Sequence, residues 1–428
     1  MTADPLQRWR LIGVAATAVI VLSVPAWLVQ NGRADAGETE IETAAFVGRE
    51  VCLPCHEQAS AAWLGSDHDL AMDVANDQTV LGDFDNATII SKGITTTFFR
   101  RERRFFVNTQ GPNGELTDFE ITHVFGHDPL QQYLVPFPGG RLQCLSIAWD
   151  RDRNEWFDLY PNQEIPPDDW LHWTRAAQNW NGMCAECHST NLKKGFDPAT
   201  KSYTTTWSEI DVSCEACHGP GSDHVAWAEI QPMARPEIEA YGLVVDTGSM
   251  TSPELVELCA PCHSRRSELG DYDHSSAALL QSHLPSLLDE GLYYADGQIL
   301  DEVYVWGSFT QSKMYANDVR CSDCHDSHSL KLKFEGNDLC LQCHRADAYD
   351  TSDHHFHKKI FEGEPSDGAL CVKCHMPEQP YMVIDERADH SLRVPRPDLS
   401  QTLGTPNACS QGGCHDDKPL KLSLIHIS

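Results

Sequence analysis

The feature that most constrains this chain is a Cys-x-x-Cys-His unit that recurs along most of its length. Such a unit is the attachment signature of c-type haem, whose vinyl groups take up the two thiols and whose iron binds the histidine. On a helix, positions i, i+3 and i+4 share one face, so all three side chains point toward one porphyrin. Seven copies, called motifs 1 to 7 in chain order, have this spacing: Cys52/Cys55/His56, Cys184/Cys187/His188, Cys214/Cys217/His218, Cys259/Cys262/His263, Cys321/Cys324/His325, Cys340/Cys343/His344 and Cys371/Cys374/His375.

An eighth copy, motif 8, is stretched to Cys409-Ser-Gln-Gly-Gly-Cys414-His415. Its longer gap moves the first thiol off the helical face, and the two glycines are candidates for the bulge that returns it. Structural zinc is the alternative, but zinc sites do not require a histidine directly after each second cysteine. The sequence therefore predicts eight covalently attached haem c groups. The one remaining cysteine, Cys144, lies in an apolar stretch and is expected to be a buried free thiol, with a functional thiol as the alternative.

Histidines outside the motifs are numerous enough to give every iron a sixth ligand. The chain has 21 histidines, and several of them lie beside a motif. Without haem, the run from His354 to His357 would indicate a zinc site. The predicted sixth ligands are His68, His172, His224, His328, His390 and at least one of His354, His355 and His357.

The charge balance is strongly acidic, with a formal net charge of −31. Such a charge keeps a protein soluble, disfavours nucleic acid as a partner and attracts basic patches on redox partners. A salty habitat is the alternative explanation for the same composition. The basic run is Arg100, Arg101, Arg103 and Arg104, interpreted as a solvated hairpin tip, with a contact to haem propionates or a partner as the alternative.

The N-terminus resembles an export signal. Arg8 and Arg10 precede an apolar run from Leu11 to Val29, and a small-x-small pattern ending at Ala36 suits cleavage. The run is also long enough to span a bilayer, so an uncleaved anchor is the alternative. Either way the body is expected to be periplasmic or exported, which agrees with haem attachment outside the cytoplasm. The apolar end of the chain is interpreted as a truncated or artefactual tail.

The predicted fold is mainly α with irregular loops, scaffolded by haem, with a small antiparallel β meander inserted after the first haem. Residues from Cys52 to Ala75 are expected to be helical with a break at Gly65, and Ser252 is expected to cap the motif 4 helix ahead of Pro253. Alternating residues predict strands at Arg104 to Val107 and Leu116 to Phe125, among others. The expected segments are 1–36 signal or anchor, 37–93 haem 1, 94–160 meander, 161–280 haems 2–4, 281–317 spacer, 318–417 haems 5–8 and 418–428 tail.

Several stretches together resemble the exported multihaem cytochromes of the cytochrome c-554 type, in the branch that often carries tetratricopeptide repeats after the last haem. The resemblance covers roughly Val47 to Asp417. It implies a mainly helical, haem-stacked architecture and electron transfer. The repeats are absent from this sequence, so no partner-binding role of theirs carries over. The matching stretches are Gly65 to Met72, Pro129 to Val135, Phe137 to Gly140, Cys184 to Asn191, Cys214 to Gly221, Cys321 to His325 and Asp389 to Asp398.

These observations predict an octahaem cytochrome with mostly bis-histidine irons that passes electrons between redox partners, either other cytochromes or a quinol-linked donor. The alternative is an oxidoreductase that acts on a small nitrogen or sulfur compound at one open haem. A third hypothesis, an interaction scaffold with structural haems, has no motif in its favour. No Cys-x-x-Cys-Lys unit, the attachment site of the catalytic haem in common multihaem nitrite reductases, is present in the sequence.

Overall fold

The computed structural model describes residues 43–270, 272, 278–411 and 413–427. The predicted signal or anchor segment lies outside the described residues. Residues 46–428 form one compact unit, which contains all eight motifs. Within the described ranges, no helix combines the length and the apolar character that crossing a bilayer requires.

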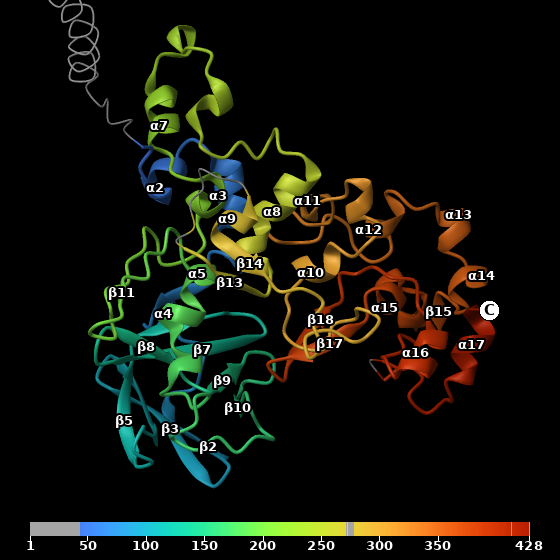
Figure 1. Ribbon diagram of the computed structural model, residues 1–428, viewed down its shortest axis with the longest axis horizontal. Helices are drawn as coiled ribbons and strands as arrows, with labels where there is room; N and C mark the ends of the chain where they lie inside the picture. Colours follow the sequence, from blue (N-terminus) through green and yellow to red (C-terminus); the bar gives the residue numbers. More distant parts are fainter. Residues whose placement is uncertain (1–42, 271, 273–277, 412, 428) are drawn as a thin grey trace, which may run out of the picture. The chain divides into compact units, whose positions relative to one another are not determined.

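Two antiparallel sheets follow motif 1 and are coloured blue to green in Figure 1. One is a four-stranded meander whose strands pair in chain order. In the other sheet the order is β1-β6-β7-β9-β10, and β8 also pairs with β7. The meander comprises β2 (Asp85–Ser91), β3 (Ile94–Arg101), β4 (Arg104–Gln110) and β5 (Leu116–Ile121). The second sheet comprises β1 (Met72–Val74), β6 (His123–Phe125), β7 (Leu130–Phe137), β8 (Arg141–Cys144), β9 (Ile147–Asp150) and β10 (Glu155–Asp158).

A single aromatic core joins the two sheets. Phe98 from β3 and Tyr133 from β7 are fully buried in the same cluster. The Trp156 ring from β10 stacks on Phe98 with a centroid separation of 3.5 Å. Burying one such ring stabilises a fold by about 2–3 kcal/mol. The sheets therefore hold together through their own side chains.

The remaining chain is made of short helices and two-stranded ribbons. The helices outside the motifs are α3 (Glu57–Trp63), α4 (Trp180–Met183), α7 (Ser222–Glu229), α9 (Leu279–Ser282), α10 (Trp306–Phe309), α13 (Ala346–Tyr349), α14 (Ser352–His355), α16 (Pro397–Leu403) and α17 (Lys421–Ile427). The ribbons are β11 (Phe196–Asp197) with β12 (Ser202–Tyr203), β13 (Arg266–Glu268) with β14 (His283–Pro285), β15 (Ile360–Phe361) with β16 (Glu364–Pro365), and β17 (Glu378–Tyr381) with β18 (Asp385–Ala388).

Motif helices are mostly single turns. They are α2 (Arg49–Cys52), α5 (Ala185–His188), α6 (Cys214–His218), α8 (Ser252–His263), α11 (Cys321–Cys324), α12 (Asp338–Leu341) and α15 (Cys371–His375). The motif 4 helix α8 is longer because its N-terminus is capped: the Thr251 N–H donates to the Glu254 carboxylate at 2.7 Å. The cap is thus Thr251, one residue before the predicted Ser252.

The prediction of a mainly α fold is wrong. Helix makes up 27% of the structure and strand 23%, so neither dominates. A Cys-x-x-Cys-His unit requires only one helical turn, and most copies have no helix beyond it. After motif 1, for example, helix ends at Trp63, because Gly65 takes a left-handed conformation with φ +76°.

The basic run lies at the β3–β4 hairpin, and three of its four arginines pair with nearby carboxylates. Arg100 pairs with Asp77, Arg101 with Asp118, and Arg104 with Glu120. These pairs are exposed, so each contributes little to stability. Their geometry favours the interpretation as a solvated hairpin tip over a contact with propionates.

Candidate functional site

Five motif histidines lie opposite a histidine from elsewhere in the chain. Two imidazoles bound to opposite sides of one metal ion have ring centroids roughly 6 Å apart, since each metal–nitrogen bond is about 2 Å. All five separations match that arrangement, so these residues fit a six-coordinate haem iron. The ring-centroid separations are 6.1 Å for His56–His224, 6.3 Å for His263–His68, 6.5 Å for His325–His390, 6.1 Å for His375–His354 and 5.8 Å for His415–His357.

Backbone carbonyls fix the orientation of many of these rings. A carbonyl oxygen only accepts, so the Nδ1 facing it carries the proton and Nε2 keeps its lone pair for a metal. The six Nδ1 donors and their acceptors are His188 to Ala71 O (3.0 Å), His224 to Tyr241 O (3.0 Å), His325 to Leu330 O (3.3 Å), His357 to His355 O (2.5 Å), His375 to Arg393 O (2.9 Å) and His390 to Ala388 O (2.9 Å).

Burial favours the neutral form of several candidate ligands. It lowers the pKa of His263 to about 4, and it also lowers the pKa of the opposing His68. Burial likewise lowers the pKa of His390 and His188. A neutral imidazole is the form that binds a metal, so at neutral pH these rings need no deprotonation before ligation.

His224 is held by a strained turn. Ala240 and Tyr241 are consecutive residues with left-handed φ values of 49° and 55°. Each such residue costs of order 1 kcal/mol and persists where its surroundings enforce it. Here the turn presents the Tyr241 carbonyl to His224, while the Trp227 ring lies against both side chains. The strain therefore orients the ring that faces His56.

Three predicted ligands have other surroundings. His172 is buried beside Trp173, and its Nδ1 accepts the Thr174 N–H at 3.4 Å. His355 accepts the His357 N–H at its own Nδ1, which leaves a buried Nε2 without a partner among the described residues. His328 interacts electrostatically with His218 of motif 3.

The histidines of two motifs lie edge-on to the ring of a phenylalanine or a tyrosine. His188 of motif 2 lies edge-on to Phe125, with centroids 5.2 Å apart. His344 of motif 6 lies edge-on to Tyr349 at 5.7 Å. Motifs 2 and 6 therefore differ from the five whose histidine faces a second imidazole.

The thiols of motifs that are distant in sequence contact one another. Helix α2 packs on α6, which brings Cys52 of motif 1 against Cys214 of motif 3. Helix α5 likewise packs on α8, with Cys187 of motif 2 against Cys262 of motif 4. None of these cysteines forms a disulfide.

The same kind of contact continues toward the C-terminus. Cys259 of motif 4 contacts Cys321 of motif 5, and Cys340 of motif 6 contacts Cys371 of motif 7. Weaker electrostatic interactions join Cys217 to Cys259, Cys324 to Cys343, and Cys374 to Cys409. Every motif thus has at least one neighbouring motif within reach of its thiols.

A small cavity of about 100 Å³ opens beside motif 7. Cys374, Ala408 and Arg393 are among the residues that line it, and the Arg393 carbonyl is the one that orients His375. The volume is well below the roughly 300–1,000 Å³ typical of small-molecule sites, so this cavity by itself does not define a ligand site.

Charged networks that sequence reasoning missed surround two of the thiol contacts. Burial raises the pKa of Asp211 to about 7, although Arg49 beside it acts in the opposite sense. Burial also opposes ionisation of Glu186, but bonds from His283 and the charge of Arg266 hold its pKa below the usual range. The sequence feature that could have pointed to these networks is the glutamate inside the Cys-x-x-Cys of motifs 2 and 3.

Cys144 is a buried free thiol, as predicted. It accepts a hydrogen bond from Gln132 at 3.0 Å within a small apolar cluster. Burial raises the pKa of Cys144 well above its ordinary value, so the thiol stays protonated. This environment suits a packing role.

Comparison with known proteins supports the assignment of the motifs. Residues 170–219 match the family model described as cytochrome c554 and c-prime, which confirms the predicted resemblance. Residues 314–349 match the model described as a doubled CXXCH motif. No curated protein matches the chain.

Among the solved structures that match, OcwA shares the fold at low sequence identity. The outer cell wall cytochrome OcwA matches with a TM-score of 0.57 and 18% identity, over 88% of this chain and 85% of that one. An undecahaem cytochrome from the S-layer of Carboxydothermus ferrireducens matches over 88% of this chain and 59% of that one, at 15% identity and a TM-score of 0.43. The octahaem sulfite reductase MccA of Wolinella succinogenes matches over 82% and 58%, at 16% identity and a TM-score of 0.34.

Proposed function

We propose that this chain, a multihaem c-type cytochrome, carries eight haems and transfers electrons along them between redox partner proteins. One observation carries the proposal: the eight motifs neighbour one another, seven of them in an unbroken series and motif 2 beside motif 4. Bound haem supplies a one-electron iron couple, whose potential depends on axial ligands, burial and nearby charge. The polypeptide supplies attachment, ligands and spacing.

The series runs through motifs 1, 3, 4, 5, 6, 7 and 8, with motif 2 beside motif 4. Cys52 contacts Cys214 at one end, and Cys374 interacts electrostatically with Cys409 at the other. Both ends reach the surface, because Cys55 of motif 1 and Cys414 of motif 8 are exposed. Electrons entering at one end could therefore leave at the other without crossing a gap between motifs.

The ligand geometry supports transfer over catalysis for most sites. We infer that His68, His224, His354, His357 and His390 are sixth ligands of motifs 4, 1, 7, 8 and 5, because each faces the histidine of that motif. His328 is proposed for motif 3 on its interaction with His218. An iron closed on both sides by imidazole exchanges electrons without binding a substrate.

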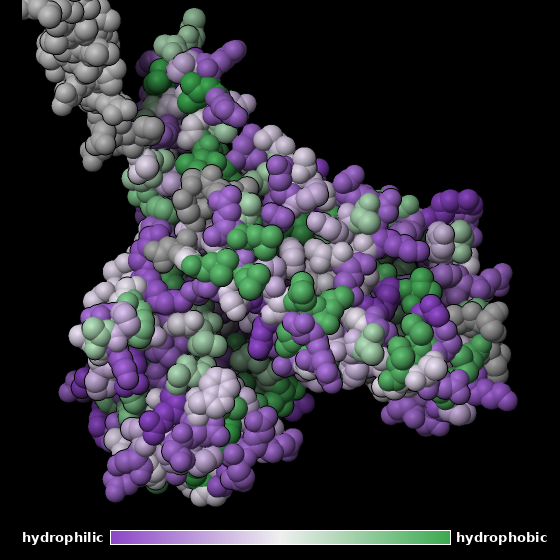
Figure 2. Space-filling model, in the orientation of Figure 1, coloured by the Kyte–Doolittle hydropathy of each residue, from purple (hydrophilic) through white to green (hydrophobic). Residues whose placement is uncertain are grey.

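The surface and the structural neighbour suit an exported protein with a protein partner. Figure 2 shows hydrophilic side chains over most of the face in view, with apolar patches between them. A net charge of −31 favours transient docking of a basic redox partner, where charge mainly sets the association rate. The similar cytochrome OcwA is described as an outer cell wall protein, which supports export here as well.

Stopped-flow reoxidation tests the proposal. The protein is matured in a host that attaches c-type haem, reduced with dithionite and mixed with an oxidised basic cytochrome. We expect fast reoxidation that slows as ionic strength rises, because salt screens the docking charges. Rapid reoxidation by nitrite, hydroxylamine or tetrathionate, with product formed over many turnovers, would instead identify an enzyme.

A second function, reduction of a small oxyanion at motif 2, is favoured by one cluster. Arg387 interacts electrostatically with His188, and Tyr304 with the Cys184 and Cys187 thiols. The Arg387 guanidinium lies 5.9 Å from the Tyr304 ring centroid. Burial raises the pKa of Tyr304, so both side chains are hydrogen-bond donors at neutral pH. A high-spin resonance that changes when nitrite is added would support this function.

A further inference from the structure

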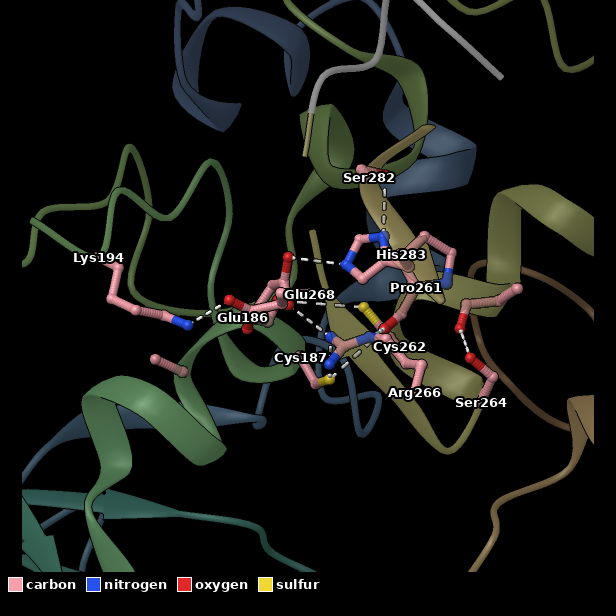
Figure 3. A network of polar contacts seen from close by, with 12 residues as sticks. Glu186, Cys187, Lys194, Pro261, Cys262, Ser264, Arg266, Glu268, Ser282 and His283 are labelled. Carbon is pink, nitrogen blue, oxygen red and sulfur yellow. Dashed lines mark hydrogen bonds and ion pairs between the residues drawn. The ribbon is translucent and has the colours of Figure 1, made fainter. Parts of the chain in front are cut away.

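Motifs 2 and 4 meet in a reciprocal crossing. The Cys187 Sγ faces the Pro261 carbonyl oxygen at 3.9 Å, and the Cys262 Sγ faces the Glu186 carbonyl oxygen at 4.0 Å. Each thiol thus approaches the carbonyl of the residue that precedes the other thiol. Figure 3 shows this crossing with the two sulfur atoms side by side. Any charge placed at the crossing acts on both motifs.

Arg266 places a positive charge at that crossing. Its Nε donates to the Pro261 carbonyl at 2.6 Å, and its Nη2 lies 3.6 Å from the Cys187 Sγ. Its side chain is only 12% exposed, so water screens the charge weakly. An arginine fork held at several points keeps a fixed position relative to both thiols.

A buried acceptor network holds Arg266 in place. Glu186, inside motif 2, accepts from the Arg266 Nη2 at 2.5 Å and from the His283 Nε2 at 3.0 Å. The His283 side chain is fully buried, and its Nδ1 bonds to the Ser282 hydroxyl at 2.8 Å. Glu268 lies beside Glu186 and forms an ion pair with Lys194 at the edge of the network (Figure 3). Arg266 is therefore anchored by a negative partner that belongs to motif 2 itself.

We propose that Arg266 is a positioning residue that raises the reduction potentials of the haems on motifs 2 and 4 together, with Glu186 acting in the opposite sense. A fixed positive charge stabilises the iron that has gained an electron relative to the iron that has lost one. Each reduction adds one electron to one iron, and no bond or proton changes. The inference rests on the proposed electron transfer, because the charge matters to function only where electrons pass through the haems of motifs 2 and 4.

Spectroelectrochemical redox titration of four holoproteins tests the inference: wild type, Arg266→Gln, Glu186→Gln and the double variant. We expect Arg266→Gln to lower the reduction potential of two of the eight haems by about 59 mV. For one electron this is a tenfold change in the oxidised-to-reduced ratio, toward the oxidised form. Glu186→Gln is expected to shift the same two equivalents in the opposite direction. The double variant should return close to wild type.

Controls separate charge from structural damage. Arg153→Gln removes an arginine whose side chain is 71% exposed and pairs within the β-sheet region, so its titration should match wild type. Arg266→Lys keeps the charge and loses the fork, so its potentials should stay near wild type even where stability falls. If Arg266→Gln fails to incorporate haem, Glu186→Gln still tests the inference, because the two reduction potentials should rise in that variant.

Three results would overturn the inference. They are no shift in either single variant, shifts of the same sign in both, or a shift spread over all eight equivalents. Failure of the proposed function is a separate outcome, because it shows as slow reoxidation of the wild-type protein by a partner cytochrome. The potentials of the variants are measured without any partner.

Discussion

Replacing His224 with alanine gives the most direct test of the ligand pairs. His224 faces His56 with ring centroids 6.1 Å apart, and the variant leaves the motif 1 iron with His56 alone. Loss of the second strong-field imidazole converts that iron from low to high spin. We expect the low-spin signal of one iron among the eight to disappear and an equivalent high-spin signal to appear. Low-temperature electron paramagnetic resonance of the oxidised protein, integrated against wild type, measures both quantities.

His172→Ala is the matched control, because His172 is also a buried histidine outside the motifs. Its Nδ1 accepts from Thr174, and its recorded ring neighbour is Trp173, so its loss should leave the spin state unchanged. A high-spin signal in His172→Ala, or none in His224→Ala, would contradict the assignment of ligands by ring geometry. Visible spectra of both variants should confirm that eight haems remain attached.

Three further predictions concern attachment and stability. Intact mass should show eight haem additions in the wild type, and Cys414→Ser should lose the second thioether of motif 8. Gly140→Ala should destabilise the holoprotein by roughly 2–4 kcal/mol in thermal unfolding, because φ is +70° and a Cβ would collide with the Tyr203 carbonyl. The control Gly65→Ala, where φ is also left-handed but the space is open, should cost only about 1 kcal/mol. Burial raises the pKa of Asp211 above its unfolded value to about 7, so its contribution to stability is present at pH 4 and lost as pH rises through 7. Asp211→Asn should therefore flatten the dependence of the unfolding free energy on pH over that range.

Local patterning predicted part of the sheet region and missed the rest for a physical reason. Strand β4 was expected over Arg104 to Val107, where apolar residues dominate, and the structure extends it to Gln110. Strand β7 escaped prediction because it buries Gln131 and Gln132, which have specific partners that no alternation rule reveals. Polar residues buried on both faces remove the period of two on which strand prediction depends.

Motif spacing defined the thiols and the proximal histidines but could not define their partners. His68 follows motif 1 in sequence, yet it faces His263 of motif 4. His224 follows motif 3 and faces His56 of motif 1. These pairings join residues more than a hundred positions apart, so they depend on how the whole chain folds. Candidate ligands could be named from sequence, whereas their pairing required the structure.

The thiol contacts between distant motifs constrain the order of assembly. Cys52 and Cys214 lie in contact, although a long stretch of chain, including both sheets, separates them. Two free thiols in contact are prone to oxidation, and a disulfide between them would consume one attachment point of each motif. We therefore expect porphyrin to be joined to the chain before α2 and α6 pack. The extended chain, rather than the folded protein, would then be the substrate for haem attachment.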